Sequence, residues 1–93
     1  MMIATLKLKL YIPWATSLKD KRMVVKSLCA KLRAKFGVSV AEVEELEVHR
    51  TAVLGVAYVG NSRAQLDSVM DHLLDWIENS SNAEITSVER EII

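Results

Sequence analysis

The sequence predicts an α+β domain in which two helices cover one face of a four-stranded antiparallel sheet. Apolar and polar residues alternate near the N-terminus, as in a strand with one buried face. Two later segments repeat apolar residues at helical spacing, and each follows a serine that can cap a helix. Segments rich in β-branched residues, which favour strands, lie between the two predicted helices and after the second one. The predicted order is β-α-β-β-α-β, in a single domain over residues 1–93.

The first strand is predicted from Ala4 to Ile12, because the residue types alternate there with a period of two. Pro13 ends it, since proline has no N–H to donate to a sheet. The even positions would face the core, and the odd positions Thr5, Lys7, Lys9 and Tyr11 would project away from the helices.

The first helix should begin near Leu18, where Ser17 and Asp20 resemble a capping box, and should end at Gly37, which tolerates the left-handed conformation. Its apolar positions fall at helical spacing: Leu18, Val25, Leu28, Cys29, Leu32 and Phe36. Leu28 and Leu32 are expected to be core residues that face Leu6, Leu8, Leu66 and Leu73.

Two antiparallel strands are predicted in the middle of the chain, over 38–43 and Val48–Val59, joined by the acidic run Glu42–Glu47. Ser62 and Gln65 form a second capping box, and a helix follows with Leu66, Val69, Met70, Leu73 and Ile77 on its apolar face. It should fade in residues 79–82, and Ile85–Ile93 should be the last strand. This order is that of the ferredoxin-like, or split β-α-β, fold.

Composition indicates a small folded protein, with 51% hydrophobic and 26% charged residues in 93. One cysteine, Cys29, excludes an intramolecular disulfide. The sequence has no apolar run long enough to span a membrane and no signal pattern, so we expect a soluble cytoplasmic protein without a membrane partner.

The net charge of zero conceals a strong asymmetry along the chain. Residues 1–36 hold nine Lys or Arg and one acid, which gives +8, and residues 37–93 hold three bases and eleven acids, which gives −8. On the first helix one side carries the candidate RNA-binding residues Lys19, Arg22, Lys26 and Arg33, which can neutralise phosphates. Lys21, Lys31 and Lys35 are expected around the other flank. The alternative is a solvated face, or exposed ion pairs with the acidic second helix.

Several separated motifs resemble the YlxP-like family of bacterial proteins of unknown function: SLKDKRMVVKSL, FGVSVAEV, LGVAYVGN and the closing VEREI. The resemblance runs nearly from end to end. It implies a ferredoxin-like fold, a bacterial cytoplasmic protein, and a gene often found among translation-initiation and ribosome-maturation genes. An RNA or ribosome connection is therefore favoured, and the resemblance transfers no catalytic residue.

Catalytic, metal and cofactor sites are not expected. His49 and His72 are far apart in sequence, Cys29 falls on the core face of its helix, and the glycine-rich phosphate loop of small phosphatases is absent. Asp71, His72 and Asp75 are more typical of a soluble helix face than of a metal site. We therefore expect no enzyme, no metal, no cofactor and no small-molecule substrate. The tryptophans Trp14 and Trp76 are interpreted as packing residues or, alternatively, a protein contact.

Two functional hypotheses remain. The first is a small accessory protein that binds RNA or a ribosomal particle through the basic helix; base stacking on the sheet is not expected, because Tyr58 is the only aromatic residue of its strand. The second is a protein-interaction or self-associating module that uses the open sheet face, with a homodimer expected.

Overall fold

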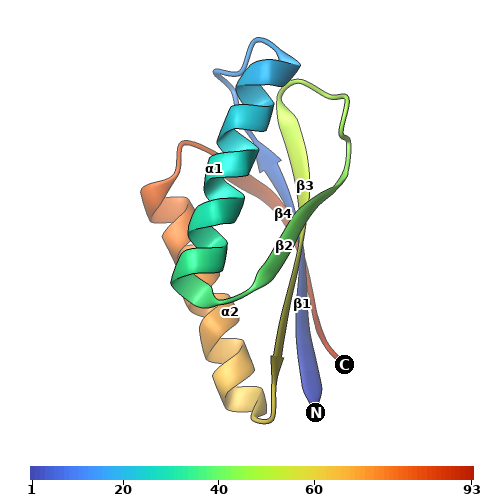
Figure 1. Cartoon of the computed structure of the whole chain (residues 1–93), viewed down its shortest axis with the longest axis vertical. Helices are drawn as coiled ribbons and strands as arrows, with labels where there is room; N and C mark the ends of the chain where they lie inside the picture. The colour runs from blue at the N-terminus through green and yellow to red at the C-terminus, as the bar shows by residue number, and fades with distance from the viewer.

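The computed structural model describes all residues 1–93 and confirms the predicted order of elements. The strands are β1 (Met2–Tyr11), β2 (Ser39–Glu44), β3 (Thr51–Gly60) and β4 (Glu84–Ile92), and the helices are α1 (Leu18–Phe36) and α2 (Arg63–Ser80). Figure 1 shows both helices on one side of the sheet, running in opposite directions, with α1 beside its upper part and α2 beside its lower part.

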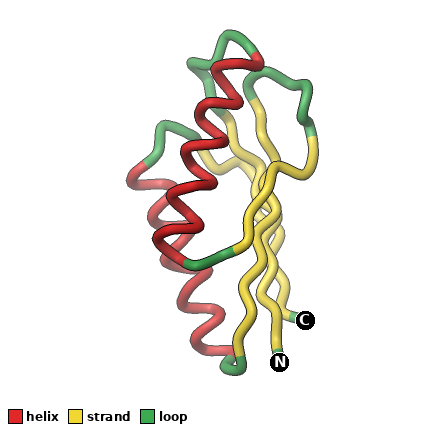
Figure 2. Tube along the Cα trace, in the orientation of Figure 1, coloured by secondary structure: helices red, strands yellow, loops and turns green.

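The sheet is antiparallel throughout, in the order β2-β3-β1-β4, which is the ferredoxin-like order. Its second face carries no helix, as the trace in Figure 2 shows. The two edges are the short strand β2, which has a bulge between Glu42 and Glu44, and the longer strand β4. No helix is long and apolar enough to cross a membrane.

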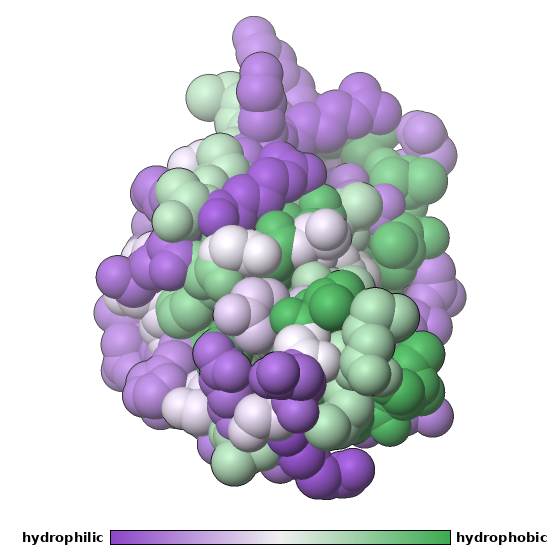
Figure 3. All heavy atoms as spheres, turned by 60° about the horizontal axis from the view of Figure 1, so that its bottom comes forward, coloured by the Kyte–Doolittle hydropathy of each residue, from purple (hydrophilic) through white to green (hydrophobic).

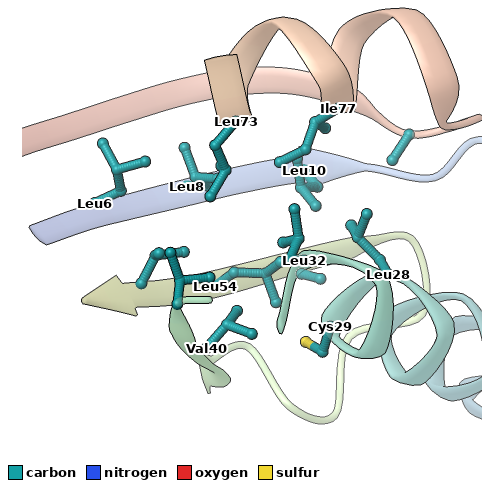
Figure 4. Close-up of a cluster of buried hydrophobic side chains, with 14 of the residues drawn as sticks. Leu6, Leu8, Leu10, Leu28, Cys29, Leu32, Val40, Leu54, Leu73 and Ile77 are labelled. Carbon is teal, nitrogen blue, oxygen red and sulfur yellow. The ribbon is translucent and has the colours of Figure 1, made fainter. Parts of the chain in front are cut away.

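The core lies between the helices and the sheet. Leu6, Leu8 and Leu10 point from β1 toward the helices, as the alternation predicts, and Figure 4 shows them between labelled residues of α2 (above) and of α1 (below). The predicted core residues Leu28 and Leu32 are 4% and 0% exposed. Burying one such leucine contributes about 1.5–3 kcal/mol, so this layer supplies most of the driving force for folding.

Both ends of α1 are built as predicted, with one difference at the start. The Ser17 hydroxyl accepts a hydrogen bond from the Asp20 N–H at 3.1 Å, whereas the Asp20 carboxylate accepts from the N–H and the hydroxyl of Thr16, at 3.0 and 2.9 Å. These two hydrogen bonds lower the pKa of Asp20 below its ordinary value. At the other end Gly37 adopts φ +67°, and its N–H donates to the Arg33 carbonyl.

The third predicted strand was too long at its start, because β3 begins at Thr51 rather than at Val48. Residues 45–50 form a turn instead: the Val48 N–H donates to the Glu45 carbonyl, and Glu45 has a positive φ of 57°. Arg50 holds the turn from outside, since its Nε donates to the Ala15 carbonyl at 3.1 Å. Residue type alone favoured a strand here, but these backbone groups are satisfied within the turn.

Candidate nucleic-acid interface

The four predicted RNA-binding residues lie on one side of α1, and all four are exposed. At about 100° per residue along a helix they fall within an arc of roughly 60°. We call Lys19, Arg22, Lys26 and Arg33 the basic stripe. The stripe flanks the helix surface that packs on the sheet, on the side nearer β2.

Only part of the basic stripe is free of internal partners. Lys19 and Lys26 make no hydrogen bond or ion pair within the chain. Arg22 lies near the β2–β3 connection, with its Nη2 3.9 Å from Glu47 Oε1, and both side chains are largely exposed. Arg33 is held more firmly, since its Nη2 donates to the Val40 carbonyl at 2.7 Å. Within the basic stripe, Lys19 and Lys26 are therefore the bases most available to an anionic ligand.

Lys21 was expected on the solvated flank, and this prediction is wrong, because the side chain is completely buried. Its Nζ donates to three carbonyl oxygens, of Glu45 at 2.8 Å, Thr51 at 3.1 Å and Leu46 at 3.4 Å. The Glu42 carboxylate lies 2.9 Å from the same nitrogen. A buried ammonium requires such a complete set of acceptors. Lys21 therefore ties the first turn of α1 to the β2–β3 connection.

Glu42 neutralises this buried charge without a directed hydrogen bond of its own. Its Oε2 is buried and lacks a partner with hydrogen-bond geometry, although it lies 2.9 Å from the Lys21 nitrogen. Oε2 lies closer to the ammonium nitrogen than the carbonyl oxygens of Thr51 and Leu46 do, and its negative charge offsets the buried positive charge.

No ion pair joins the two helices, so of the two alternatives to a binding surface, the one in which the bases of α1 meet the acids of α2 is wrong. Asp67 and Asp71 instead face β4, where their carboxylates lie 3.2 and 2.7 Å from the Arg90 guanidinium. The hydrogen bond that Arg90 donates to Asp71 raises the pKa of Arg90 above its ordinary value. The acids that approach the basic stripe come from the β2–β3 connection, through Glu47.

The open sheet face is divided into a charged part and an apolar part. Lys7 pairs with Glu44, and Lys9 lies 3.1 Å from Glu45, so the bases of β1 are matched by acids of the neighbouring segment. The hydrogen bond to Glu44 raises the pKa of Lys7. Tyr58 pairs with the buried Ala4 and contacts the core, so it does not offer its ring to this face.

The apolar part lies at the end of the sheet where the chain begins and ends. Ile3 pairs with Val59 in β3 and exchanges two backbone hydrogen bonds with Ile93. Val59 and Ile93 are 58% and 65% exposed. Figure 3 looks toward this end and shows hydrophobic residues (green) gathered at the centre and right, with hydrophilic residues (purple) around them.

A groove of about 310 Å³ opens between α1, the C-terminal part of α2 and the turn that leads to β4. We call it the interhelix groove; its lining residues are Trp14, Met23, Val24, Ser27, Leu28, Lys31, Trp76, Ser80, Ser81 and Asn82. The Trp76 ring also meets Phe36 edge to face, with ring centroids 6.3 Å apart. Sequence reasoning considered the tryptophans separately and did not bring them to one cavity.

The remaining titratable residues form no site of their own. Cys29 is buried, and burial raises the pKa of its thiol, as expected of a core cysteine rather than a nucleophile. No three His, Cys, Asp or Glu side chains are grouped so that they could hold a metal ion. His72 contacts its own helix, with Nδ1 2.7 Å from the Ser68 carbonyl oxygen.

Comparison with known proteins agrees with the fold and with the resemblance seen in the motifs. A de novo designed protein with a ferredoxin fold, solved by solution NMR, superposes with a TM-score of 0.59 at 12% identity, over 99% of this chain and 85% of its own. The uncharacterized protein YlxP of Bacillus subtilis (strain 168) is 31% identical over 77 residues, which cover 83% of this chain and 84% of YlxP. The model of the family described as "Protein of unknown function (DUF503)" matches residues 3–90. The chain belongs to the DUF503 family.

Proposed function

We propose that this protein is a non-enzymatic cytoplasmic accessory protein that binds RNA, free or in a ribosomal particle, through the basic stripe of α1. The observation that carries the proposal is the pair Lys19 and Lys26, which are exposed and have no partner within a chain of balanced charge. Most exposed bases of the sheet, by contrast, are matched by acids. Unmatched cations on one helix face are suited to phosphate groups.

Binding through this stripe should be weak and largely independent of sequence. Its long side chains can reach phosphate oxygens, which position a nucleic acid but carry no base information. Non-specific contacts of this kind give dissociation constants of about 10⁻⁴ to 10⁻⁶ M at physiological salt. Glu47 lies near Arg22 and should keep the affinity toward the weak end of that range.

The test compares two charge-matched double variants. Lys19→Gln/Lys26→Gln removes two bases of the stripe, and Lys7→Gln/Lys9→Gln removes two bases of the opposite sheet face. Fluorescence anisotropy with a labelled ribosomal RNA fragment should show weaker binding for the first variant and near wild-type binding for the second. Equal losses in both variants would mean that only net charge matters, and unchanged affinity in both would remove the basic stripe as the binding surface.

A second candidate function, self-association through the open sheet face, is favoured by the apolar row Ile3, Val59 and Ile93. Exposed apolar patches on small proteins often mark interfaces. A homodimer of this kind would bury roughly 1,200–2,000 Å² in total. Sedimentation velocity should then show a dimer that Val59→Glu converts to monomer. A strict monomer at high micromolar concentration would contradict this candidate.

A further inference from the structure

The interhelix groove differs in charge from most of the other cavities of the molecule. Lys31 is its one charged lining residue, and no aspartate or glutamate lines it. Two of the other three cavities include glutamates, among them Glu44 and Glu89, and the third has no charged residue. The interhelix groove therefore combines apolar lining residues with one positive charge, which suits a ligand that has a flat apolar part joined to an anion.

One edge of the basic stripe, formed by Lys19 and Lys26, adjoins the groove, whereas Arg22 and Arg33 lie on the other side, toward β2 and its connection to β3. Met23, which lines the groove and is 63% exposed, is four residues after Lys19 and three before Lys26. Residues at these spacings are surface neighbours on a helix, with Cβ atoms about 5–6 Å apart. A chain of phosphates that follows Lys19 and Lys26 would thus pass directly beside the groove opening.

The lining offers both stacking and hydrogen-bonding groups. Trp14 is 49% exposed, and its indole is available on the connection that precedes α1. The side chains of Ser27, Ser80 and Asn82 make no hydrogen bond within the chain, so their donors and acceptors are free. Tryptophan rings stack on any base, and small polar groups bond to base edges.

We propose that the interhelix groove receives an unpaired base of single-stranded RNA, stacked on Trp14, while Lys19, Lys26 and Lys31 hold the flanking phosphates. This inference rests on the proposed RNA binding of α1 and adds a preference for single strands over duplexes. An aromatic platform beside a positive track is the usual means of binding single strands without sequence preference.

The test uses a short labelled adenosine oligonucleotide, a duplex RNA of the same length, and two variants of Trp14. Trp14→Leu removes the stacking ring and keeps an apolar side chain, and Trp14→Phe keeps a ring. Loss of one stacked base should weaken single-strand binding about 5- to 150-fold in Trp14→Leu. Duplex binding should not change, and Trp14→Phe should retain most of the single-strand affinity. Thermal unfolding of each variant establishes that the fold is intact.

A direct readout is the emission of Trp14 itself. In Trp76→Phe, Trp14 is the single tryptophan, and the oligonucleotide should quench its fluorescence. If the oligonucleotide does not quench Trp14 and Trp14→Leu binds it with unchanged affinity, the groove is not a base-binding site. The proposed function is nevertheless supported in that case if Lys19→Gln/Lys26→Gln still weakens RNA binding. If adenosine monophosphate binds as tightly as the oligonucleotide, the groove is a nucleotide site and the single-strand proposal is wrong. If only an apolar peptide quenches Trp14, the groove is a protein contact and the proposal is also wrong.

Discussion

Replacing the buried Lys21 by methionine should destabilise the protein far more than the same replacement of an exposed lysine of α1. Methionine preserves most of the apolar stem and removes the ammonium that bridges α1 to the β2–β3 connection. The Glu42 carboxylate, whose side chain is only 12% exposed, would then be left without its counter-charge, and the carbonyls of Glu45 and Thr51 without their donor. Breaking a buried ion pair from one side costs about 3–5 kcal/mol.

That loss is large for a domain of this size, because native proteins have only about 0.05–0.15 kcal/mol of stability per residue. Urea unfolding followed by circular dichroism measures it directly. Lys26→Met is the matched control, since Lys26 is exposed and has no partner, and it should change the free energy of unfolding by less than about 0.5 kcal/mol.

The double variant Lys21→Met/Glu42→Gln separates the ion pair from the packing. It should be more stable than the sum of the two single changes implies, because it removes both buried charges together. A loss below about 1 kcal/mol in Lys21→Met, or strictly additive single effects, would show that the ammonium and the carboxylate are solvated in solution and that the connection is not held by them.

Four further predictions test the rest of the structure. Leu32→Ala should cost about 2–5 kcal/mol in urea unfolding, since Leu32 is fully buried; a change near zero would refute the packing. Gly37→Ala should cost about 1–2 kcal/mol by the same measurement, because φ is +67° there. Because the pKa of Asp20 is lowered in the folded protein, its ionised carboxylate stabilises the fold above about pH 4, and this stabilisation is lost as the pH falls through the lowered pKa. Asp20→Asn should therefore make the free energy of unfolding depend less on pH in the acid range. Cys29 should react with a thiol reagent far more slowly in the folded protein than in urea, and equal rates would contradict its burial.

Most of the fold was predictable because it follows from local signals. The alternation in β1, the two serine caps and Gly37 each have a direct physical cause within a few residues, and the structure has all of them. The order of elements then leaves few compact arrangements, and the ferredoxin-like sheet is one of them. The start of β3 was missed because its boundary depends on a distant side chain, Lys21, which binds the carbonyls of the preceding turn.

The spacing of Lys21 along α1 indicated that it is buried, but its charge argued for an exposed position. Lys21 precedes Val25, Leu28 and Leu32 by four, seven and eleven residues, which is the spacing of the core face itself. A lysine was assigned to solvent because lysines are almost never fully buried unless paired. Its partners come from a segment more than twenty residues away, so the pairing could not be read from the helix alone.

The candidate site was predictable only in part. Helical spacing placed the four bases on one side of α1, but it could not show that Arg33 is bound to Val40 or that Glu47 approaches Arg22. These contacts depend on where β2 and its connection lie. The interhelix groove was not predictable for the same reason, because Trp14 and Trp76 line one groove only once α1 and α2 are packed together.

The salt dependence of RNA binding tests the role of the basic stripe most directly. Each phosphate contact contributes about −0.7 to −0.9 to the slope of log K against log salt, so four contacts predict a wild-type slope of roughly −3 to −4. Lys19→Gln/Lys26→Gln should flatten that slope by about 1.4 to 1.8, with the unfolding temperature nearly unchanged. A slope that is the same in the wild type and in this variant would contradict phosphate binding by α1.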